Sequence, residues 1–296
     1  MKVLLLGGNG FLGRGLQDEL TCRGADFCSL DINDIDLSMN SSIRELSSML
    51  KDFTNVVLLA AKIGRELFNK NPIPNAQEND SIFKNVLNAM SLTSSAIGRN
   101  FDFTFYSSSE VFGSVGKDSV ITSSTNTLYS TRPRGAYANQ KIDSEEILKV
   151  MVESKITIDR LKILRPFNVT GKYQKRGVIY DMLSSAMKEG KIWYSDDTTR
   201  SFTTSEYAKK VAVSEILSKN TLSIKNISEN ITMYMKDVAE LVSDCLGGGI
   251  EIIKNPPDDE IRFRQTSTLE STNESDTEKL RKVVIEMIED MKRDDF

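Results

Sequence analysis

A glycine-rich loop between a buried strand and a helix constrains the fold more than any other feature of this 296-residue chain. Residues 3–6 form an uninterrupted apolar run, which is typical of a parallel strand covered on both faces. Gly7, Gly10 and Gly13 follow with the spacing G-x-x-G-x-x-G, and a helical apolar pattern over residues 11–23 begins inside this loop. Glycines allow a sharp turn and a close backbone approach to phosphate, which the N–H groups of a helix N-terminus attract.

An acidic residue lies at the position where a dinucleotide-binding loop of this kind is usually followed by a ribose-binding residue. Asp31 lies 18 residues beyond Gly13, at the end of a second short strand over residues 27–31. A carboxylate there accepts hydrogen bonds from the adenosine ribose and repels a 2′-phosphate, which favours NAD over NADP. The alternative is a tight strand–helix turn followed by a surface Asp. Because strand, loop, helix and acid coincide, we interpret the unit as a dinucleotide-binding motif.

Strands and helices alternate along the first half of the chain. We predict further strands over residues 55–59, 101–105 and 157–164, and helices near Ile43 to Leu50 and over residues 80–97 and 137–152. This alternation indicates crossover units, so we expect an α/β fold with a doubly wound parallel sheet, a Rossmann fold.

The pattern changes after residue 168, where the elements become shorter. The predicted elements are helices over residues 178–188, 206–217, 236–246 and 277–292, a strand near Ile192, and a mobile loop over residues 266–276. We therefore assign residues 1–168 to an NAD-binding domain, on which elements of residues 195–220 can also pack. Residues 169–296 are expected to form mainly a small C-terminal α/β lobe that binds substrate.

The sequence contains no histidine, which excludes Ser-His-Asp triads, Cys-His dyads and histidine-bound metals. Cys22, Cys28 and Cys245 form no C-x-x-C pair, so we expect no metal site and interpret them as reduced, buried thiols of a cytoplasmic protein. The 38 basic and 42 acidic side chains give a net charge of −4, which argues against a nucleic-acid partner. No apolar run is long enough to predict a membrane span.

Tyr137 and Lys141 lie four residues apart on a predicted helix and therefore share one face. Tyrosine is a poor base at its usual pKa of about 10. A nearby lysine cation and a positive nicotinamide ring favour the phenolate, which supplies an acid/base group without histidine. The alternative interpretation of this pair is an ordinary amphipathic helix.

The sequence resembles the extended short-chain dehydrogenase/reductase family, the NAD-dependent nucleotide-sugar epimerases and dehydratases. The matching segments occur in the family's order along nearly the whole chain. They are the glycine loop, Ala60-Ala61, Asn79, Ser107-Ser108-Ser109-Glu110-Val111-Phe112-Gly113, the Tyr137/Lys141 pair, Leu164-Arg165-Pro166-Phe167-Asn168-Val169-Thr170-Gly171 and Arg200-Ser201-Phe202.

This resemblance implies a reaction that passes through a 4-keto sugar after hydride transfer from C4 to NAD. It implies that Ser108 binds the oxygen that is oxidised, that Tyr137 takes its proton, and that Lys141 holds the nicotinamide ribose and lowers the pKa of Tyr137. Glu110 resembles the acidic residue that moves a proton at C5 in the family's dehydratases. The alternative for Glu110 is a loop residue that bonds only the backbone.

The remaining implied contacts concern the cofactor and a nucleotide-sugar partner. Besides Tyr137 and Lys141, the implied cofactor-binding residues are Gly7, Gly10, Phe11, Leu12, Gly13, Asp31, Asp36, Leu37, Ala60, Ala61, Lys62, Asn79 and Pro166. The implied substrate-binding residues are Ser109, Asn168, Tyr194, Arg200 and Arg262. Arginine suits a diphosphate because its planar fork donates two hydrogen bonds at once.

Departures from the family pattern lie mostly in the substrate lobe, and they leave the substrate open. Tyr194-Ser195-Asp196-Asp197 replaces a glycine-containing family segment, and the absence of histidine excludes the reductase–epimerases that make GDP-fucose. Two alternatives stay open: an NAD(P)H-dependent 4-ketoreductase and a non-catalytic NAD-binding sensor or scaffold.

The resemblance also implies a homodimer that pairs the helices over residues 80–97 and 137–152. Apolar residues on these helices fit either a dimer interface or an ordinary core. They are Ile82, Val86, Met90, Ile142, Ile147 and Val150.

Overall fold

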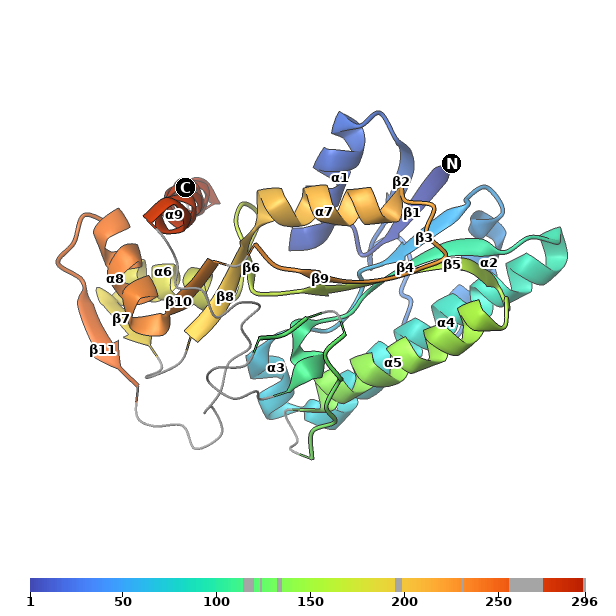
Figure 1. The fold of residues 1–296 in the computed structure, drawn as a ribbon, viewed down its shortest axis with the longest axis horizontal. Helices are drawn as coiled ribbons and strands as arrows, with labels where there is room; N and C mark the ends of the chain where they lie inside the picture. Colours follow the sequence, from blue (N-terminus) through green and yellow to red (C-terminus); the bar gives the residue numbers. More distant parts are fainter. Residues whose placement is uncertain are drawn as a thin grey trace. The chain divides into compact units, whose positions relative to one another are not determined.

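A six-stranded sheet forms the centre of the first of two compact units (Figure 1). The computed structural model describes residues 1–113, 120–122, 124–131, 135–194, 199–229, 231–255 and 274–294. The strand order is β2-β1-β3-β4-β5-β9. The strands are β1 (Lys2–Leu6), β2 (Asp26–Leu30), β3 (Asn55–Leu58), β4 (Phe101–Tyr106), β5 (Ile158–Pro166) and β9 (Leu222–Ile227). The pairs between β2 and β5 along this order are all parallel.

Helices cover both faces of this sheet, which is the doubly wound arrangement predicted from the sequence (Figure 1). On one face α1 (Phe11–Cys22) lies with α7 (Ser205–Ile216), and Arg23 at the end of α1 donates hydrogen bonds to Ser214 and to the carbonyl of Lys210 on α7. On the other face α2 (Ser42–Leu50) packs on α4 (Pro72–Ile97), which packs on α5 (Ala136–Glu153). Two short elements, α3 (Arg65–Lys70) and the 3-10 turn η1 (Ser109–Phe112), complete this unit.

The chain order places a switch point between β1 and β3. From β1 the chain first adds β2 on one side, then crosses over β1 to add β3 on the other side. Ligands of such sheets bind at the carboxyl ends of the strands where this reversal occurs. The glycine loop follows β1 directly, so the fold positions it at that edge.

Phenylalanine side chains pack among aliphatic ones in the core of the first unit. Phe83 on α4 packs on Phe105 of β4 with ring centroids 5.5 Å apart, and Phe101 and Phe103 are fully buried on the same strand. The apolar runs of β1 and β3 are also buried, as expected for strands covered on both faces.

The second unit is built from residues 114–126, 166–208 and 227–296, so the two units interleave along the chain. A sheet of order β10-β8-β6 and a two-stranded sheet β11-β7 pack with three helices around a separate core. The elements are β6 (Val169–Thr170), α6 (Val178–Glu189), β7 (Lys191–Tyr194), β8 (Thr199–Thr204), β10 (Ile231–Tyr234), α8 (Met235–Cys245), β11 (Glu251–Lys254) and α9 (Glu274–Asp294). The role of residues 169–296 in binding substrate stays a prediction.

Several predictions of local structure were wrong in their bounds. The helix expected from residue 80 begins at Pro72, because proline is favoured in the first turn, where its missing N–H is not needed. Residues 274–276, expected in a loop, belong to α9, and residues 266–273 lie outside the described part. The strands β8, β9, β10 and β11 were not predicted.

The cysteines are free, as expected, but the prediction that they are buried was wrong. Cys22 is exposed at the end of α1, and Cys28 and Cys245 are partly exposed. Where the structure is described, no helix is both long and apolar enough to cross a membrane. The same part of the chain holds no cluster of three or more acidic or thiol side chains arranged to bind a metal ion.

Candidate active site

Two glycines of the loop are required by packing. Gly7 has φ +94°, and a Cβ at this position would lie 2.6 Å from the backbone nitrogen of Ala60. A Cβ on Gly13 would lie 2.4 Å from the carbonyl oxygen of Gly8. The loop therefore folds tightly against β3 and against itself only because these side chains are absent.

Gly10 is different, because its Cα faces open space. A Cβ there would meet only the carbonyl oxygen of Gly7, at 3.5 Å. Gly10 caps α1, whose first turn (Phe11, Leu12, Gly13) carries N–H groups without helical partners. The open face, the helix N-terminus and the absent side chain together fit the pyrophosphate of a dinucleotide.

Asp31 sits beside this loop at the end of β2. Its Oδ2 accepts a hydrogen bond from the Asn9 N–H at 2.9 Å, and its Oδ1 accepts one from the Ile32 N–H at 2.8 Å. The carboxylate is only partly buried, so further lone pairs of its oxygens can accept hydrogen bonds from ribose hydroxyls. The structure thus brings the predicted acid to the predicted loop.

Asp36 and Leu37, the two further residues expected to contact adenosine, differ in the exposure of their side chains. Asp36 is exposed, and hydrogen bonds from the Ser38 hydroxyl and N–H hold its pKa below the usual range. The Leu37 side chain lies in the core, and its carbonyl accepts a hydrogen bond from the Asn85 amide at 2.9 Å. Leu37 can therefore offer a ligand only its backbone.

The buried side-chain amide of Asn79, on α4, holds the segment after β3. The Asn79 side chain accepts from the Lys62 N–H at 2.6 Å and donates to the Lys62 carbonyl at 3.0 Å. The Lys62 ammonium pairs with Glu78 at 3.1 Å. These bonds fix the course of Ala60, Ala61 and Lys62 beside Gly7, so Asn79 positions the segment that the sequence predicts to line the cofactor.

Tyr137 and Lys141 lie on one face of α5, as their spacing predicts, and both contact the end of β4. Ser108, which caps η1, is hydrogen-bonded to the Tyr137 phenol. The Lys141 ammonium donates to the Tyr106 carbonyl at 2.9 Å and lies 4.5 Å from the centre of the Phe105 ring. The Phe68 ring contacts the Tyr137 ring edge-on at 5.3 Å.

Burial controls the protonation of this pair in the structure. It raises the pKa of Tyr137 to about 12, against a lowering by the Ser108 hydrogen bond and a further raising by the Glu110 charge. Burial also lowers the pKa of Lys141 to about 7, against the raising effect of Glu145. Burial is the largest effect on the pKa of each group, and the lowering of the Tyr137 pKa by Lys141 stays a prediction.

Glu110 and Ser109 lie in η1, directly after Ser108. The Glu110 carboxylate is exposed, and its charge acts on Tyr137. The Glu110 N–H donates to the Ser108 hydroxyl oxygen at 3.2 Å, and Ser109 is buried. The proximity to Tyr137 agrees with either interpretation of Glu110.

The other predicted substrate residues belong to the second unit. Asn168, which has φ +33°, donates from its side chain to the Ser201 carbonyl at 2.8 Å, and Arg200 precedes Ser201 on β8. Tyr194 ends β7, and its carbonyl accepts from the Asn255 N–H at 2.8 Å. Pro166 is the last residue of β5, and Arg262 lies outside the described residues. Asn168, which directly precedes β6, is therefore bonded to the residue that follows Arg200 on β8.

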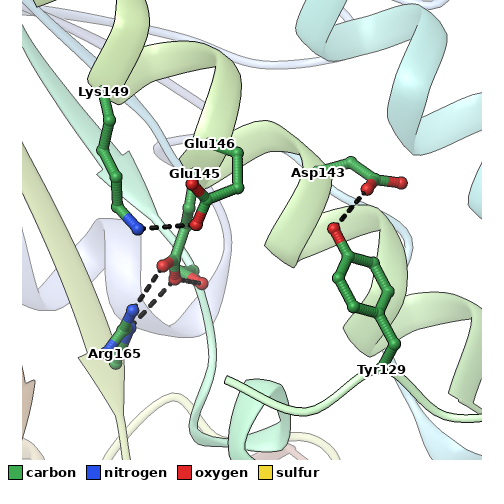
Figure 2. A network of polar contacts seen from close by, with 7 residues as sticks. Tyr129, Asp143, Glu145, Glu146, Lys149 and Arg165 are labelled. Carbon is green, nitrogen blue, oxygen red and sulfur yellow. Dashed lines mark hydrogen bonds and ion pairs between the residues drawn. The ribbon is translucent and has the colours of Figure 1, made fainter. Parts of the chain in front are cut away.

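The sequence interpretation missed a buried ion pair beside Lys141. Glu145 on α5 pairs with Arg165 on β5, and Figure 2 shows the guanidinium facing the carboxylate. The sequence marks each residue separately: Glu145 follows Lys141 by one helical turn, and Arg165 lies inside a segment that matches the family. Nothing in the spacing alone connects the two residues.

Comparison with known proteins agrees with this geometry. The sequence matches the NAD dependent epimerase/dehydratase family over residues 3–209. The chain therefore belongs to this family, and its cofactor is NAD. A comparison with curated proteins found no match.

Solved structures share the fold over nearly the whole chain. A UDP-glucose 4-epimerase of Thermus thermophilus, in complex with NAD, has 18% identity and a TM-score of 0.79, with 99% of each chain covered. A UDP-N-acetylglucosamine 4-epimerase of Methanobrevibacter ruminantium M1 has 21% identity and a TM-score of 0.80, covering 99% of this chain and 98% of the other. The dTDP-glucose 4,6-dehydratase DesIV of Streptomyces venezuelae has 16% identity and a TM-score of 0.80, covering 98% and 97%.

Gly10→Val is expected to weaken NAD binding at least about tenfold and to leave the thermal unfolding temperature nearly unchanged. The added side chain projects from the open face of the loop, where the pyrophosphate approaches. Gly13→Val is the matched comparison and should lower both quantities, because its side chain meets the Gly8 backbone. Titration calorimetry and thermal melts measure the two effects, and equal NAD affinity for Gly10→Val and wild type would contradict the assignment.

Lys141→Met is expected to change how stability depends on pH. The folded pKa of about 7 lies below the usual value of 10.5. Between these values the unfolded chain binds more protons, so the Lys141 contribution to stability rises with pH, by up to about 1.4 kcal/mol per unit. The stability advantage of Lys141→Met over wild type should be largest below pH 7 and shrink as the pH rises toward 10. Denaturant unfolding across this range measures it, and a pH-independent difference would refute the buried, shifted lysine.

Proposed function

We propose that the chain is an NAD-dependent nucleotide-sugar epimerase or dehydratase that works through a 4-keto sugar. The observation that carries this proposal is the assembly of Ser108, Tyr137 and Lys141 at the end of β4, in a chain of this family. A serine can bind a substrate hydroxyl, and a tyrosine phenolate can take its proton. A lysine cation nearby can stabilise that phenolate. A protein that only senses NAD needs none of them.

The chain's own residues then divide the proton chemistry. The Ser108 hydroxyl binds the O4 hydroxyl of the sugar, and Tyr137 takes its proton as C4 is oxidised. The Lys141 ammonium favours the phenolate form of Tyr137 by its charge. Bound NAD supplies a reversible hydride acceptor for C4 of the sugar.

Glu110 distinguishes the two reactions within this proposal. Elimination of water across C5–C6 of the 4-keto sugar requires removal of the C5 proton, and 4-epimerisation does not. Glu110 offers a carboxylate for this step, since it is exposed and close enough to Tyr137 for its charge to raise the tyrosine pKa. A dehydratase therefore depends on Glu110, and an epimerase tolerates its replacement by Gln.

We assign the remaining contacts by the chemistry of the residues. Asp31 selects NAD over NADP, because a carboxylate beside the ribose repels a 2′-phosphate. Asn168, Arg200 and Arg262 bind the diphosphate of the nucleotide sugar, and Tyr194 and Ser109 border the base and the sugar. The cytoplasm is the proposed location, supported by three free thiols.

We also propose a homodimer through α4 and α5. Of the six apolar residues expected at this interface, Ile82, Val86, Met90 and Ile142 are buried within the chain itself. Ile147 and Val150 are exposed on α5, and Leu92 is exposed on the adjacent α4. Exposed apolar side chains gathered on two packed helices support a surface that a second copy covers.

Tyr137→Phe is expected to lower the conversion of the accepted nucleotide sugar by about 10²–10⁴-fold, because the phenol oxygen is the proton acceptor. A panel of UDP-, GDP-, dTDP- and CDP-sugars, analysed by mass spectrometry, measures the conversion. Tyr129→Phe is the matched control, since the Tyr129 hydroxyl bonds Asp143 on α5 and Tyr129 has no role in the proposed reaction.

The same panel separates the alternatives. Conversion without net change in NAD supports the proposal, whereas net oxidation of NAD(P)H identifies a ketoreductase. NAD binding without turnover of any sugar identifies a sensor or scaffold. Full activity of Tyr137→Phe rejects the proposed mechanism.

Replacing both Ile147 and Val150 with Glu is expected to convert the dimer to a monomer, because charges would be buried at the interface. Light scattering coupled to gel filtration measures the mass. Ile156→Glu is the control, because Ile156 is exposed outside α4 and α5. A monomeric wild-type chain would remove the proposal.

A further inference from the structure

Three ionisable side chains are buried together beside the candidate active site. Lys141, Glu145 and Arg165 expose only 4%, 0% and 2% of their surfaces. Burying charge is costly unless each charge is paired and hydrogen-bonded. The burial of Glu145, paired with Arg165 and one helical turn from Lys141, therefore calls for an explanation beyond chain stability.

The Glu145 carboxylate is held rigidly. Its Oε1 accepts from the Ser107 hydroxyl at 2.5 Å and from Arg165 Nε at 3.0 Å, and its Oε2 accepts from Arg165 Nη2 at 2.5 Å. The Arg165 guanidinium also lies 5.0 Å from the centre of the Phe112 ring in η1. One carboxylate thus joins α5, the end of β4, β5 and, through Arg165, η1; Figure 2 shows its pairing with Arg165.

Tyr137, Lys141 and Glu145 follow one another at four-residue intervals along one face of α5. Their partners are three consecutive residues at the end of β4. Tyr137 bonds Ser108, Lys141 bonds the Tyr106 carbonyl, and Glu145 bonds Ser107. Movement of Glu145 would therefore displace both catalytic residues of α5 and the turn that presents Ser108.

Glu145 also acts on Lys141 by its charge. Burial lowers the pKa of Lys141, and the Glu145 carboxylate opposes that effect. The other groups around the pair are Tyr137 on α5, the Tyr106 carbonyl and Phe105 ring of β4, Glu110 in η1, and Arg165 on β5. Arg165 is a permanent cation that pairs with Glu145, and its charge does not help to keep Lys141 charged.

We propose that Glu145 is a positioning residue of the active site, whose buried carboxylate keeps Lys141 charged and aligned with Tyr137. The catalytic meaning of this role rests on the proposed function, since a charged Lys141 favours the phenolate that takes the substrate proton. Arg165 and Ser107 serve Glu145 by fixing its orientation.

The direct test is an NMR titration of the Lys141 ¹³Cε resonance in the chain labelled with [6-¹³C]lysine. Lys141→Met assigns the signal by its loss. In Glu145→Gln the titration midpoint is expected to fall by about one pH unit, a tenfold weaker binding of the proton. Glu146→Gln is the matched control, because Glu146 is the next residue and pairs with the partly exposed Lys149 at 2.7 Å; its midpoint should equal that of wild type (Figure 2).

A second variant guards against misfolding of Glu145→Gln, which removes the carboxylate that pairs with Arg165. Glu145→Gln combined with Arg165→Met removes both charges of the pair, and it should lower the Lys141 midpoint by less than Glu145→Gln alone, because the loss of the Arg165 cation partly offsets the loss of the carboxylate. Ser107→Ala keeps both charges, so its midpoint should stay at the wild-type value. A wild-type midpoint in the folded Glu145→Gln or double variant would overturn the proposal and leave a purely structural ion pair.

An activity measurement adds an independent arm. If the wild type converts a nucleotide sugar, the pH above which kcat declines should move down in Glu145→Gln by the same interval as the NMR midpoint. A decline at an unchanged pH would overturn the proposed link to catalysis. If the wild type converts no sugar, the proposed function fails, while the NMR titration still decides whether Glu145 sets the charge on Lys141.

Discussion

The contact between one face of α5 and the end of β4 is the constraint on which the candidate site depends. Tyr137, Lys141 and Glu145 lie one helical turn apart, and they meet three successive residues of the strand end. Two features make this match possible. Helix α5 packs on α4, and Ser108 begins the 3-10 turn η1 just after β4. A helix shifted by one residue would separate Tyr137 from Ser108 and leave the Glu145 and Lys141 charges unpaired in the interior.

The chemistry of the site follows from desolvation in a chain without histidine. Burial raises the pKa of Tyr137 to about 12 and lowers the pKa of Lys141 to about 7, so burial alone favours the neutral form of each group. A proton acceptor at neutral pH therefore requires positive charge near the phenol. In the proposed mechanism, Lys141, with Glu145 beside it, and the positive nicotinamide ring of bound NAD supply that charge.

Local spacing made much of the fold and part of the site predictable. The glycine loop, Asp31 and the Tyr137/Lys141 pair each depend on residues close in sequence, and the structure places them as expected. The strands β8 to β11 were missed because they are short and mix polar with apolar residues, as in Thr199–Thr204. The Glu145–Arg165 pair joins residues 20 apart on a helix and a strand, and the pKa of Tyr137 depends on burial, so both depend on tertiary packing.

In the proposed reaction, a hydride leaves C4 of a nucleotide sugar and returns to the same molecule. Tyr137 accepts the O4 proton when C4 is oxidised. A substrate that carries deuterium at C4 tests this most directly, with the product analysed by NMR and mass spectrometry. The deuterium is expected to stay in the sugar, at C4 in an epimerase and at C6 in a dehydratase, because NAD is unchanged over the cycle. Loss of the deuterium to water, or its accumulation in free NADH, would rule out this reaction.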